Sequence, residues 1–208
     1  MPDGMMMRLA FFASHGGSGA KAIVEAIGNG TLNAHPAVLL SNNPDSKALI
    51  WAESIKLPAF VVNKKIFGDN SAADQFTLNT LKKNEVTHIL LSGYMRKISD
   101  SIVREYPNRI INIHPGLLPE YGGEGMYGKK IHEAVIANNE KETGITIHFV
   151  DCNYDTGPVI AQKKIEIYMD DTSESLEERV KREEGPFYVD VIKKIESGEI
   201  DMDCVARL

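Results

Sequence analysis

Cysteine is scarce in this sequence, which has only Cys152 and Cys204 among its 208 residues. A chain with so few cysteines, and without disulfide-like spacing, is not a disulfide-stabilised secreted scaffold. We therefore expect two free thiols in a reducing compartment and a cytoplasmic protein. Cys152 would act as a nucleophile only if its thiol were activated, and we interpret it as a buried free thiol.

An excess of positive charge is also missing. The chain has 23 lysines and arginines against 29 aspartates and glutamates, a formal net charge of −6. This balance argues against generic nucleic-acid binding, but it leaves room for a local basic pocket that holds a small anion. No apolar run approaches the roughly 20 residues of a membrane span, and the short run around Arg8 predicts a first strand rather than a signal peptide. We expect small-molecule partners, with no nucleic acid and no membrane.

Apolar residues make up 43% of the chain. That fraction supports a sizeable core, and the length predicts one domain over 1–208 with a flexible start at 1–7. Short apolar segments alternate with longer amphipathic ones. This alternation predicts strands at 8–14, 34–42, 59–63, 87–93 and 109–114 and helices at 20–30, 45–57 and 72–84. Strands rich in Val, Ile and Leu with interleaved helices are typical of an α/β fold, a doubly wound, mostly parallel sheet with helices on both faces.

The same pattern continues in the second half of the chain. It predicts a helix at 129–140 and strands at 145–150 and 159–167, each strand with one polar face and near a sheet edge. A terminal helix is predicted to begin at about Ser173. We expect Gly185 and Pro186 to interrupt it, because proline lacks the N–H that a helix interior needs.

The segment SHGGSGAKAI (14–23) joins the first predicted strand to the first predicted helix. At such a junction backbone N–H groups and a helix N-terminus point beyond the strand ends, which suits a phosphate. The G-x-G-x-x-G spacing is absent, and Lys21 is followed by Ala22 rather than by the hydroxyl residue of a Walker A loop. A tight turn that needs glycine for its geometry alone explains the same residues, so both interpretations stay open.

The run INIHPGLLP (111–119) carries two polar residues in an otherwise apolar strand. Side chains alternate along a strand, so Asn112 and His114 share a face, and Pro115 limits the strand directly after His114. Polar residues at the carboxyl end of a parallel strand lie where such folds place reacting groups. The alternative is a core histidine whose hydrogen bonds are satisfied within the protein.

The loop DCNYDTGPVI (151–160) contributes a carboxylate, Asp155. Asp155 either caps a turn or faces an imidazole and stabilises its charged form. A metal site made of His114, His148 and Asp155 is a further alternative. These three residues lack a compact ligand motif, and we predict no metal.

Together, INIHPGLLP and HFVDCNYDTGPVI (148–160) resemble the signature of the formyltransferase family that uses 10-formyltetrahydrofolate, most closely the branch that formylates glycinamide ribonucleotide. The segments LSGYMRKIS (91–99) and RVKREEGPFY (179–188) extend the resemblance over nearly the whole chain. The resemblance implies a Rossmann-like formyltransferase fold. It also implies transfer of a formyl group from 10-formyltetrahydrofolate, as co-substrate, to the amine of glycinamide ribonucleotide in purine biosynthesis. We expect a monomer or a homodimer.

The resemblance also assigns roles to particular residues. It implies that catalysis is carried by Asn112, His114 and Asp155. It implies contacts with the ribonucleotide from Gly17, Ser18, Gly19, Pro115, Lys181 and Glu184. It implies contacts with the folate from Met95, Arg96, Lys97, Ile98, Val150, Asp151 and Tyr154.

Two segments depart from the family pattern. Gly19 stands where the family usually has asparagine, so a side-chain contact is lost while backbone donors remain. The stretch YGGEGMYGKKIHEAV (121–135) replaces a shorter stretch of the family, and we assign no site residue there.

The chemistry of formyl transfer suits these residue types. An amine attacks a carbonyl and a negative oxygen develops, which an amide N–H of Asn112 and a cationic His114 can stabilise. Asp155, by favouring imidazolium, would make His114 useful near neutral pH. Two alternatives remain: a formyltetrahydrofolate deformylase, whose additional N-terminal domain we do not expect before the first strand, and a non-catalytic folate- or nucleotide-binding module.

Overall fold

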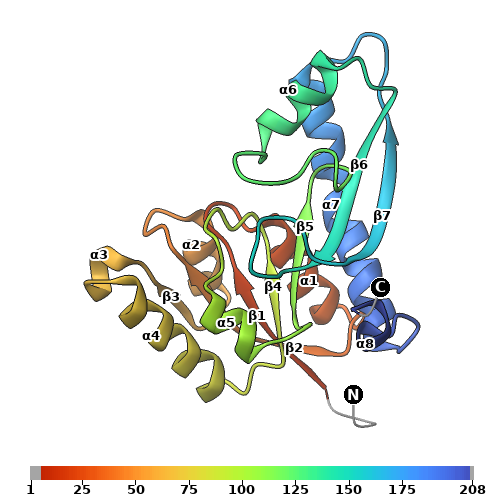
Figure 1. Ribbon diagram of the computed structural model, residues 1–208. Coiled ribbons are helices and arrows are strands. Elements are labelled where there is room, and N and C mark those ends of the chain that lie inside the picture. Colours follow the sequence, from red (N-terminus) through yellow and green to blue (C-terminus); the bar gives the residue numbers. More distant parts are fainter. Residues whose placement is uncertain (1–5, 207–208) are drawn as a thin grey trace. The chain divides into compact units, whose positions relative to one another are not determined.

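The computed structural model of the chain describes residues 6–206 and contains two compact units, which divide between Ile111 and Asn112. Seven strands form one sheet in the order β3-β2-β1-β4-β5-β6-β7 (Figure 1). In the first unit, β1 pairs in parallel with β2 and β4, and β2 pairs in parallel with β3, whereas β6 and β7 of the second unit pair antiparallel. The prediction of a mostly parallel α/β sheet is therefore confirmed.

The first unit is built from β1 (Met7–Phe12), α1 (Ser18–Gly28), β2 (Ala34–Ser41), α2 (Lys47–Ser54), β3 (Ala59–Val61), α3 (Lys64–Phe67), α4 (Asn70–Lys83), β4 (His88–Leu91) and α5 (Asp100–Glu105). Strand β1 pairs in parallel with β2 on one side and with β4 on the other. The chain runs outward from β1 to β3 and then returns to β4, so the strand order reverses beside β1. Open α/β sheets bind ligands at such a reversal, outside the carboxyl ends of the strands.

The central strands β1 and β4 are buried along nearly their whole length, because both of their faces are covered. Leu9, Ala10, Phe11 and Phe12 of β1 are all buried, as expected for a parallel strand between helices. Met7, which the sequence placed in a flexible start, begins β1 instead and is buried. Residues 1–5 of that segment lie outside the described residues.

The short helices α3, α5 and α8 (Met202–Val205) were not predicted. They are too short to display a helical period, and local capping defines α3. The side chain of Asn63 accepts hydrogen bonds from the backbone N–H groups of Lys65 and Ile66.

The second unit contains α6 (Lys129–Ala137), β6 (Glu142–Phe149), β7 (Val159–Glu166), α7 (Ser173–Glu196) and α8, and β5 (Ile110–His114) runs across the division. Strands β6 and β7 form an antiparallel hairpin whose connection is the loop 150–158. Strand β7 is partly exposed at the sheet edge, as predicted. The polar face predicted for β6 is wrong, because Thr143, Thr146 and His148 are buried.

Helix α7 continues through Gly185 and Pro186 as one helix (Figure 1), so the predicted interruption is wrong. A proline inside a helix costs about 3 kcal/mol. Apolar side chains on both sides of Pro186 are buried, among them Val180, Tyr188 and Ile192, and α7 packs against α6 and β6. Burial of several such side chains, at about 1.5 to 3 kcal/mol each, outweighs the cost of the proline.

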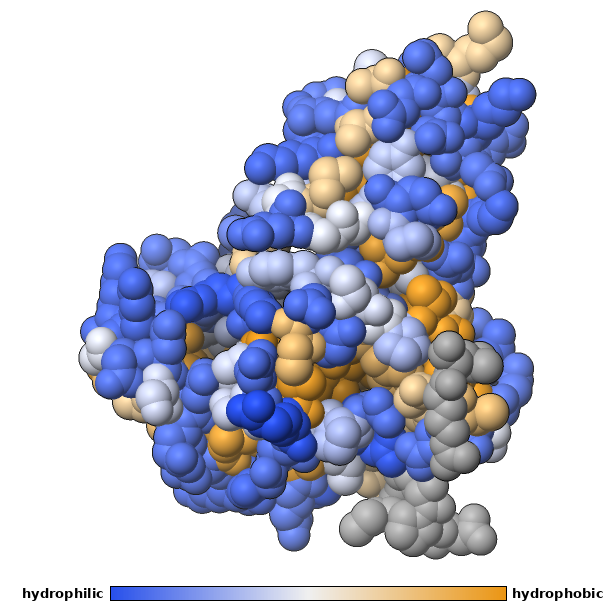
Figure 2. Space-filling model, viewed as in Figure 1, coloured by the Kyte–Doolittle hydropathy of each residue, from blue (hydrophilic) through white to orange (hydrophobic). Residues whose placement is uncertain are grey.

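Hydrophilic residues cover most of the face seen in Figure 2, and apolar residues form separate small patches on it. Among the described residues, no helix has the length and apolar character needed to span a membrane.

Candidate active site

The glycine loop is a strained turn at the N-terminus of α1. Gly17 is the N-cap residue of α1 and has a left-handed backbone, with φ 62°. A Cβ atom at this position would lie 3.0 Å from Cβ of Ala48, so glycine is required both by conformation and by space. The geometric interpretation of this glycine is therefore correct, and it is compatible with phosphate binding.

The first four backbone N–H groups of α1 differ in whether they have an acceptor within the protein. The N–H of Ala20 donates to Oγ of Ser92 at 3.1 Å, and the N–H of Lys21 donates to the carbonyl of Gly17 at 3.0 Å. In the part of the chain that the structure describes, the N–H groups of Ser18 and Gly19 have no protein acceptor. Free N–H groups at the positive end of a helix dipole are suited to an anion.

The segment 95–98, predicted to contact folate, begins beside this loop. Ser14 donates its backbone N–H to the carbonyl of Gly93 at 3.1 Å, and Oγ of Ser14 accepts from the N–H of Met95 at 2.7 Å. Strands β1 and β4 are adjacent and end at the same edge, which explains the contact. Ile98 is buried. The side chain of Arg96 contacts Asn70, and that of Lys97 contacts Asp100.

The predicted catalytic residues Asn112, His114 and Asp155 come together in the second unit. Nδ1 of His114 lies 3.7 Å from Oδ2 of Asp155. His148 lies between Asn112 and Asp155, because its Nε2 is 3.0 Å from Nδ2 of Asn112 and 3.5 Å from Oδ1 of Asp155. The His114 and His148 side chains are only 5% and 1% exposed, and that of Asp155 is 13% exposed. The four side chains form one largely buried polar cluster.

Hydrogen bonds to backbone carbonyls define which ring nitrogens carry protons. Nδ1 of His148 lies 2.7 Å from the carbonyl of Phe149, so this nitrogen is the donor and Nε2 of the neutral ring is an acceptor. The acceptor orients Asn112, whose amide donates one of its two N–H groups to His148; among residues 6–206, the other N–H has no protein acceptor. Nε2 of His114 donates in the same way to the carbonyl of Tyr121 at 2.7 Å, so Nδ1 is its proton-accepting nitrogen.

Burial dominates the protonation of His114. Burial lowers the pKa of His114, the charge of Asp155 and the hydrogen bond to Tyr121 raise it, and His148 lowers it, with a net result below the ordinary value. Asp155 therefore acts in the expected direction, but burial outweighs it. Burial raises the pKa of Asp155 itself, but the neighbouring His148 and His114 rings and the hydrogen bond from the N–H of Gly123 lower it, with a net result below the ordinary value.

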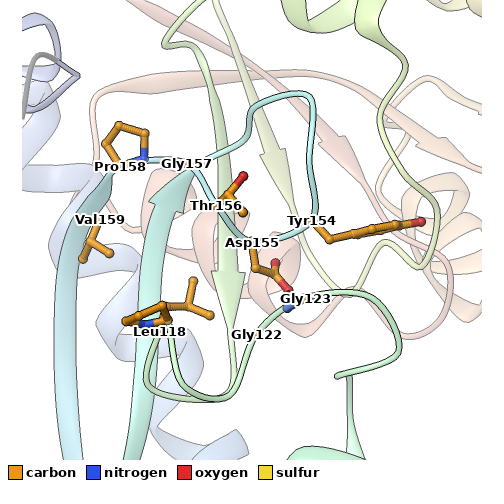
Figure 3. A pocket seen from close by; sticks show the side chains of 10 residues that line it. Leu118, Gly122, Gly123, Tyr154, Asp155, Thr156, Gly157, Pro158 and Val159 are labelled. Atoms are coloured by element: carbon orange, nitrogen blue, oxygen red, sulfur yellow. Dashed lines mark hydrogen bonds between the residues drawn. The ribbon is translucent and has the colours of Figure 1, made fainter.

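A cavity of about 590 Å³ opens beside Asp155. It is lined by Leu118, Pro119, Gly122, Gly123, Tyr154, Asp155, Thr156, Gly157, Pro158 and Val159. Figure 3 shows the Asp155 carboxylate directed toward Gly123, whose N–H donates to Oδ2 at 3.0 Å. Tyr154, a predicted folate contact, therefore lines the same cavity as the Asp155 carboxylate.

The remaining residues of the 150–158 loop have other surroundings. The carboxylate of Asp151 accepts hydrogen bonds from Oγ1 of Thr156 at 2.8 Å and from the N–H of Asn153 at 2.8 Å, which holds the loop in shape. Val150 is half-buried directly before it. Cys152 is exposed rather than buried, because it lies in a loop that projects its side chain away from the core.

The predicted ribonucleotide contacts of this unit lie on α7 and after β5. Burial raises the pKa of Glu184 to about 7, while Lys181 lowers it and Glu177 raises it. Nζ of Lys181 lies 2.6 Å from Oε1 of Glu177. Pro115 is half-buried next to His114.

The sequence model of the formyl transferase family matches residues 7–192, which include the glycine loop, the segment 95–98 and the polar cluster. The chain belongs to the formyl transferase family. Phosphoribosylglycinamide formyltransferase of Bacillus subtilis (strain 168) is 39% identical over 190 residues, which are 91% of this chain and 95% of that protein. The chloroplastic phosphoribosylglycinamide formyltransferase of Vigna unguiculata is 38% identical over 188 residues, 90% of this chain. The chain spans 60% of the length of the Vigna protein.

A solved structure shows the same formyl transferase fold. The crystal structure of glycinamide ribonucleotide transformylase 1 from Geobacillus kaustophilus aligns with a TM-score of 0.85 at 37% identity. The alignment covers 92% of this chain and 99% of that chain.

Several residues that organise the formyl transferase site were not predicted. Ser14 and Ser92 each follow a buried strand and join the ends of β1 and β4, and a serine directly after an apolar run is the signal that could have indicated them. His148 was considered only as a metal ligand, yet it orients Asn112. Thr146 and His148 are alternate residues of one strand and therefore share a face, and this polar pair was the signal that could have indicated His148. Tyr121 acts through its backbone carbonyl, which no sequence pattern indicates.

The residues considered for a metal site do converge, but their nitrogens have other partners. Nε2 of His114 and Nδ1 of His148 both face backbone carbonyls. Within residues 6–206, no group of three or more His, Cys, Asp or Glu side chains is arranged to hold a metal ion.

Proposed function

We propose that this protein transfers a formyl group from 10-formyltetrahydrofolate to the amine of glycinamide ribonucleotide, a step of purine biosynthesis. The observation that carries the proposal is the convergence of Asn112, His114 and Asp155 in one buried cluster. Membership of the formyl transferase family and the names of the similar relatives support it. The scarcity of cysteine supports a cytoplasmic location for the reaction, whereas the Vigna relative is named chloroplastic.

Asn112 would stabilise the tetrahedral intermediate. When the amine attacks the formyl carbonyl, the carbonyl oxygen becomes negative and needs a donor that is already oriented. One N–H of Asn112 is held by His148 at 3.0 Å, which fixes the plane of the amide and leaves the second N–H for this oxygen. The donor therefore needs little reorganisation during the reaction.

His114 would transfer the proton. Its lowered pKa leaves the ring neutral at neutral pH in the free protein, so Nδ1 can accept the proton that the attacking amine loses. The resulting imidazolium faces the Asp155 carboxylate at 3.7 Å and adds positive charge near the negative oxygen. The same proton then passes to the departing folate nitrogen, and the C–N bond to the folate breaks.

The two substrates would contact the other residues that the family resemblance assigns to them. The ribonucleotide phosphate fits the free N–H groups of Ser18 and Gly19. Lys181 and Glu184 on α7, with Pro115, suit the remainder of the ribonucleotide. For the folate we propose Val150, Asp151 and Tyr154 of the β6–β7 loop together with the segment Met95–Ile98.

The test is tetrahydrofolate release from 10-formyltetrahydrofolate, measured with and without glycinamide ribonucleotide. We expect release only when the ribonucleotide is present. Equal release in both samples would identify a deformylase, and substrate binding without release in either sample would identify a binding module. Either of these results would overturn the proposal.

A further inference from the structure

Two backbone groups of one short segment hold both ionisable members of the catalytic cluster. The carbonyl of Tyr121 accepts from Nε2 of His114 at 2.7 Å, and the N–H of Gly123 donates to Oδ2 of Asp155 at 3.0 Å. Gly122 between them packs closely, because a Cβ there would lie 2.3 Å from the Cδ2 methyl of Leu118 and 3.1 Å from Cβ of Asp155, so a side chain would have to displace Leu118. The position of segment 121–123 therefore sets the surroundings of His114 and Asp155 together.

The side chain of Tyr121 fixes this segment to the end of α6. The phenolic hydroxyl donates to Oε1 of Glu140 at 2.8 Å and accepts from Nδ2 of Asn138, the C-cap residue of α6, at 3.1 Å. The tyrosine is 9% exposed, whereas Glu140 is exposed. A buried ring with two hydrogen bonds is a firm attachment, and net hydrogen bonds of this kind contribute about 1 kcal/mol each.

We propose that Tyr121 is a positioning residue for formyl transfer: its hydroxyl, anchored by Glu140 and Asn138, holds the backbone carbonyl that orients the imidazole of His114. The proposal rests on the proposed function for the role of His114, and neither Tyr121 nor Glu140 contacts the reacting atoms in it. Tyr121 is the first residue of the segment 121–135, in which the sequence analysis assigned no site residue.

The carbonyl has two effects on His114. It keeps the proton of the neutral ring on Nε2, so that Nδ1 is the basic nitrogen facing Asp155. It also stabilises the imidazolium, because a carbonyl is an acceptor for a charged donor. The other ionisable groups that face His114 are Asp155 of the loop, His148 of β6 and His132 of α6, and all three stay in place when the hydroxyl is removed.

Loss of the hydrogen bonds of the Tyr121 hydroxyl should therefore lower the pKa of His114 further, because the carbonyl that stabilises the imidazolium is held less firmly. The variants are Tyr121→Phe, which removes the hydroxyl, and Glu140→Ala, which removes its acceptor. Glu140→Gln keeps an acceptor oxygen and should behave as the wild type. Tyr168→Phe is the matched control, since Tyr168 is 51% exposed and stacks its ring, not its hydroxyl, on Arg179.

The first measurement is the NMR titration of the histidine C–H resonances in the free full-length protein, with His114 assigned from a His114→Gln variant. We expect Tyr121→Phe and Glu140→Ala to move the His114 midpoint to lower pH, and Glu140→Gln and Tyr168→Phe to leave it unchanged. The double variant Tyr121→Phe/Glu140→Ala should shift no further than Tyr121→Phe alone, because Tyr121→Phe already removes the hydroxyl that donates to Glu140. An unchanged midpoint in both Tyr121→Phe and Glu140→Ala overturns the proposal.

The second measurement is the formyl transfer rate. We expect Tyr121→Phe and Glu140→Ala to lower kcat by about three- to tenfold with KM unchanged, and Glu140→Gln to restore it. A fall in kcat without a shift of the His114 titration would indicate a merely structural hydroxyl and overturn the proposal. If Tyr121→Phe does not fold, the Glu140→Ala and Glu140→Gln pair decides. If the wild type transfers no formyl group, the proposed function fails. The titration still decides whether the Tyr121 hydroxyl positions His114.

Discussion

The side-chain amide of Asn112 lies 3.0 Å from Nε2 of His148, a ring that is almost completely buried and whose Nδ1 donates to the carbonyl of Phe149. The two residues belong to different strands, β5 and β6. Because the Phe149 carbonyl fixes the tautomer of His148, it also fixes that the nitrogen end of the Asn112 amide faces His148. The direction of the second N–H of that nitrogen is thereby set. A backbone group thus orients the proposed oxyanion donor through an intervening imidazole.

Removal of the donor and removal of its orientation should both slow formyl transfer, the first more than the second. We expect Asn112→Ala to lower the single-turnover rate by roughly 10²- to 10³-fold, the usual loss of one oxyanion donor. His148→Leu, which leaves Asn112 in place but unoriented, should lower it by about tenfold. His148→Gln, which keeps an acceptor, should lose less. The double variant Asn112→Ala/His148→Leu should be no slower than Asn112→Ala. Multiplicative losses would show that His148 acts independently of Asn112.

Asp155→Asn removes the charge that raises the pKa of His114 and keeps the size of the side chain. The pKa of His114 should then fall further, so the free enzyme keeps a neutral, proton-accepting His114 down to lower pH. The acid limb of the kcat/KM profile should move to lower pH while the plateau falls, because the imidazolium formed in the reaction lacks its counter-charge. Rates measured across pH with both substrates provide the check, and an acid limb that stays in place would argue that Asp155 does not control His114.

Gly17→Ala tests the glycine loop. The substitution adds a Cβ that would lie 3.0 Å from Ala48 at a left-handed backbone position, so it should reduce the free energy of unfolding by about 1 to 2 kcal/mol. It should also weaken ribonucleotide binding, since the N–H groups of Ser18 and Gly19 follow directly, and spare folate binding. Gly16→Ala is the control for stability, because a Cβ there meets nothing within 4 Å. Weaker folate binding with ribonucleotide binding intact would assign the loop to the other substrate.

His88 should make the protein sensitive to acid. Burial, and then the positive charge of Arg109, lower the pKa of His88 to about 3, so the folded state stays unprotonated where the unfolded chain accepts a proton. Its contribution is fully present above the ordinary pKa of 6.5 and is lost as the pH falls from there toward 3. At pH 4.5 the loss should be about 2 to 3 kcal/mol. His88→Leu should remove this part of the pH dependence, which urea unfolding at pH 7.5 and 4.5 measures. Parallel losses in variant and wild type would contradict it.

The sequence predicted the parts of the fold that follow from periodicity. Alternating strands and helices were readable because the central strands β1 and β4 are buried on both faces and so form short apolar runs. Pro186 misled the prediction, since local propensity says nothing of the apolar side chains that α7 buries on both sides of it. The short helix α3 depends on one capping side chain, Asn63, and such a signal extends over too few residues to be recognised.

The candidate site was predictable where side chains carry the chemistry. Asn112, His114 and Asp155 are polar residues in apolar or turn-rich settings, and the structure brings them together. The backbone groups of Tyr121 and Gly123 have no sequence signal, because any residue except proline provides a carbonyl and an N–H. The protonation of His114 was not predictable either, since its lowered pKa depends on burial.

The most direct test of the central claim follows the formyl carbon itself. The protein is incubated with 10-formyltetrahydrofolate labelled with ¹³C at the formyl carbon and with glycinamide ribonucleotide, and the label is located by NMR. We expect one labelled formamide on the ribonucleotide for each tetrahydrofolate released. The double variant Asn112→Ala/His114→Ala should still bind both substrates and transfer the label at least 10²-fold more slowly. Label in free formate, or transfer by the double variant at the wild-type rate, would contradict the claim that this cluster catalyses formyl transfer.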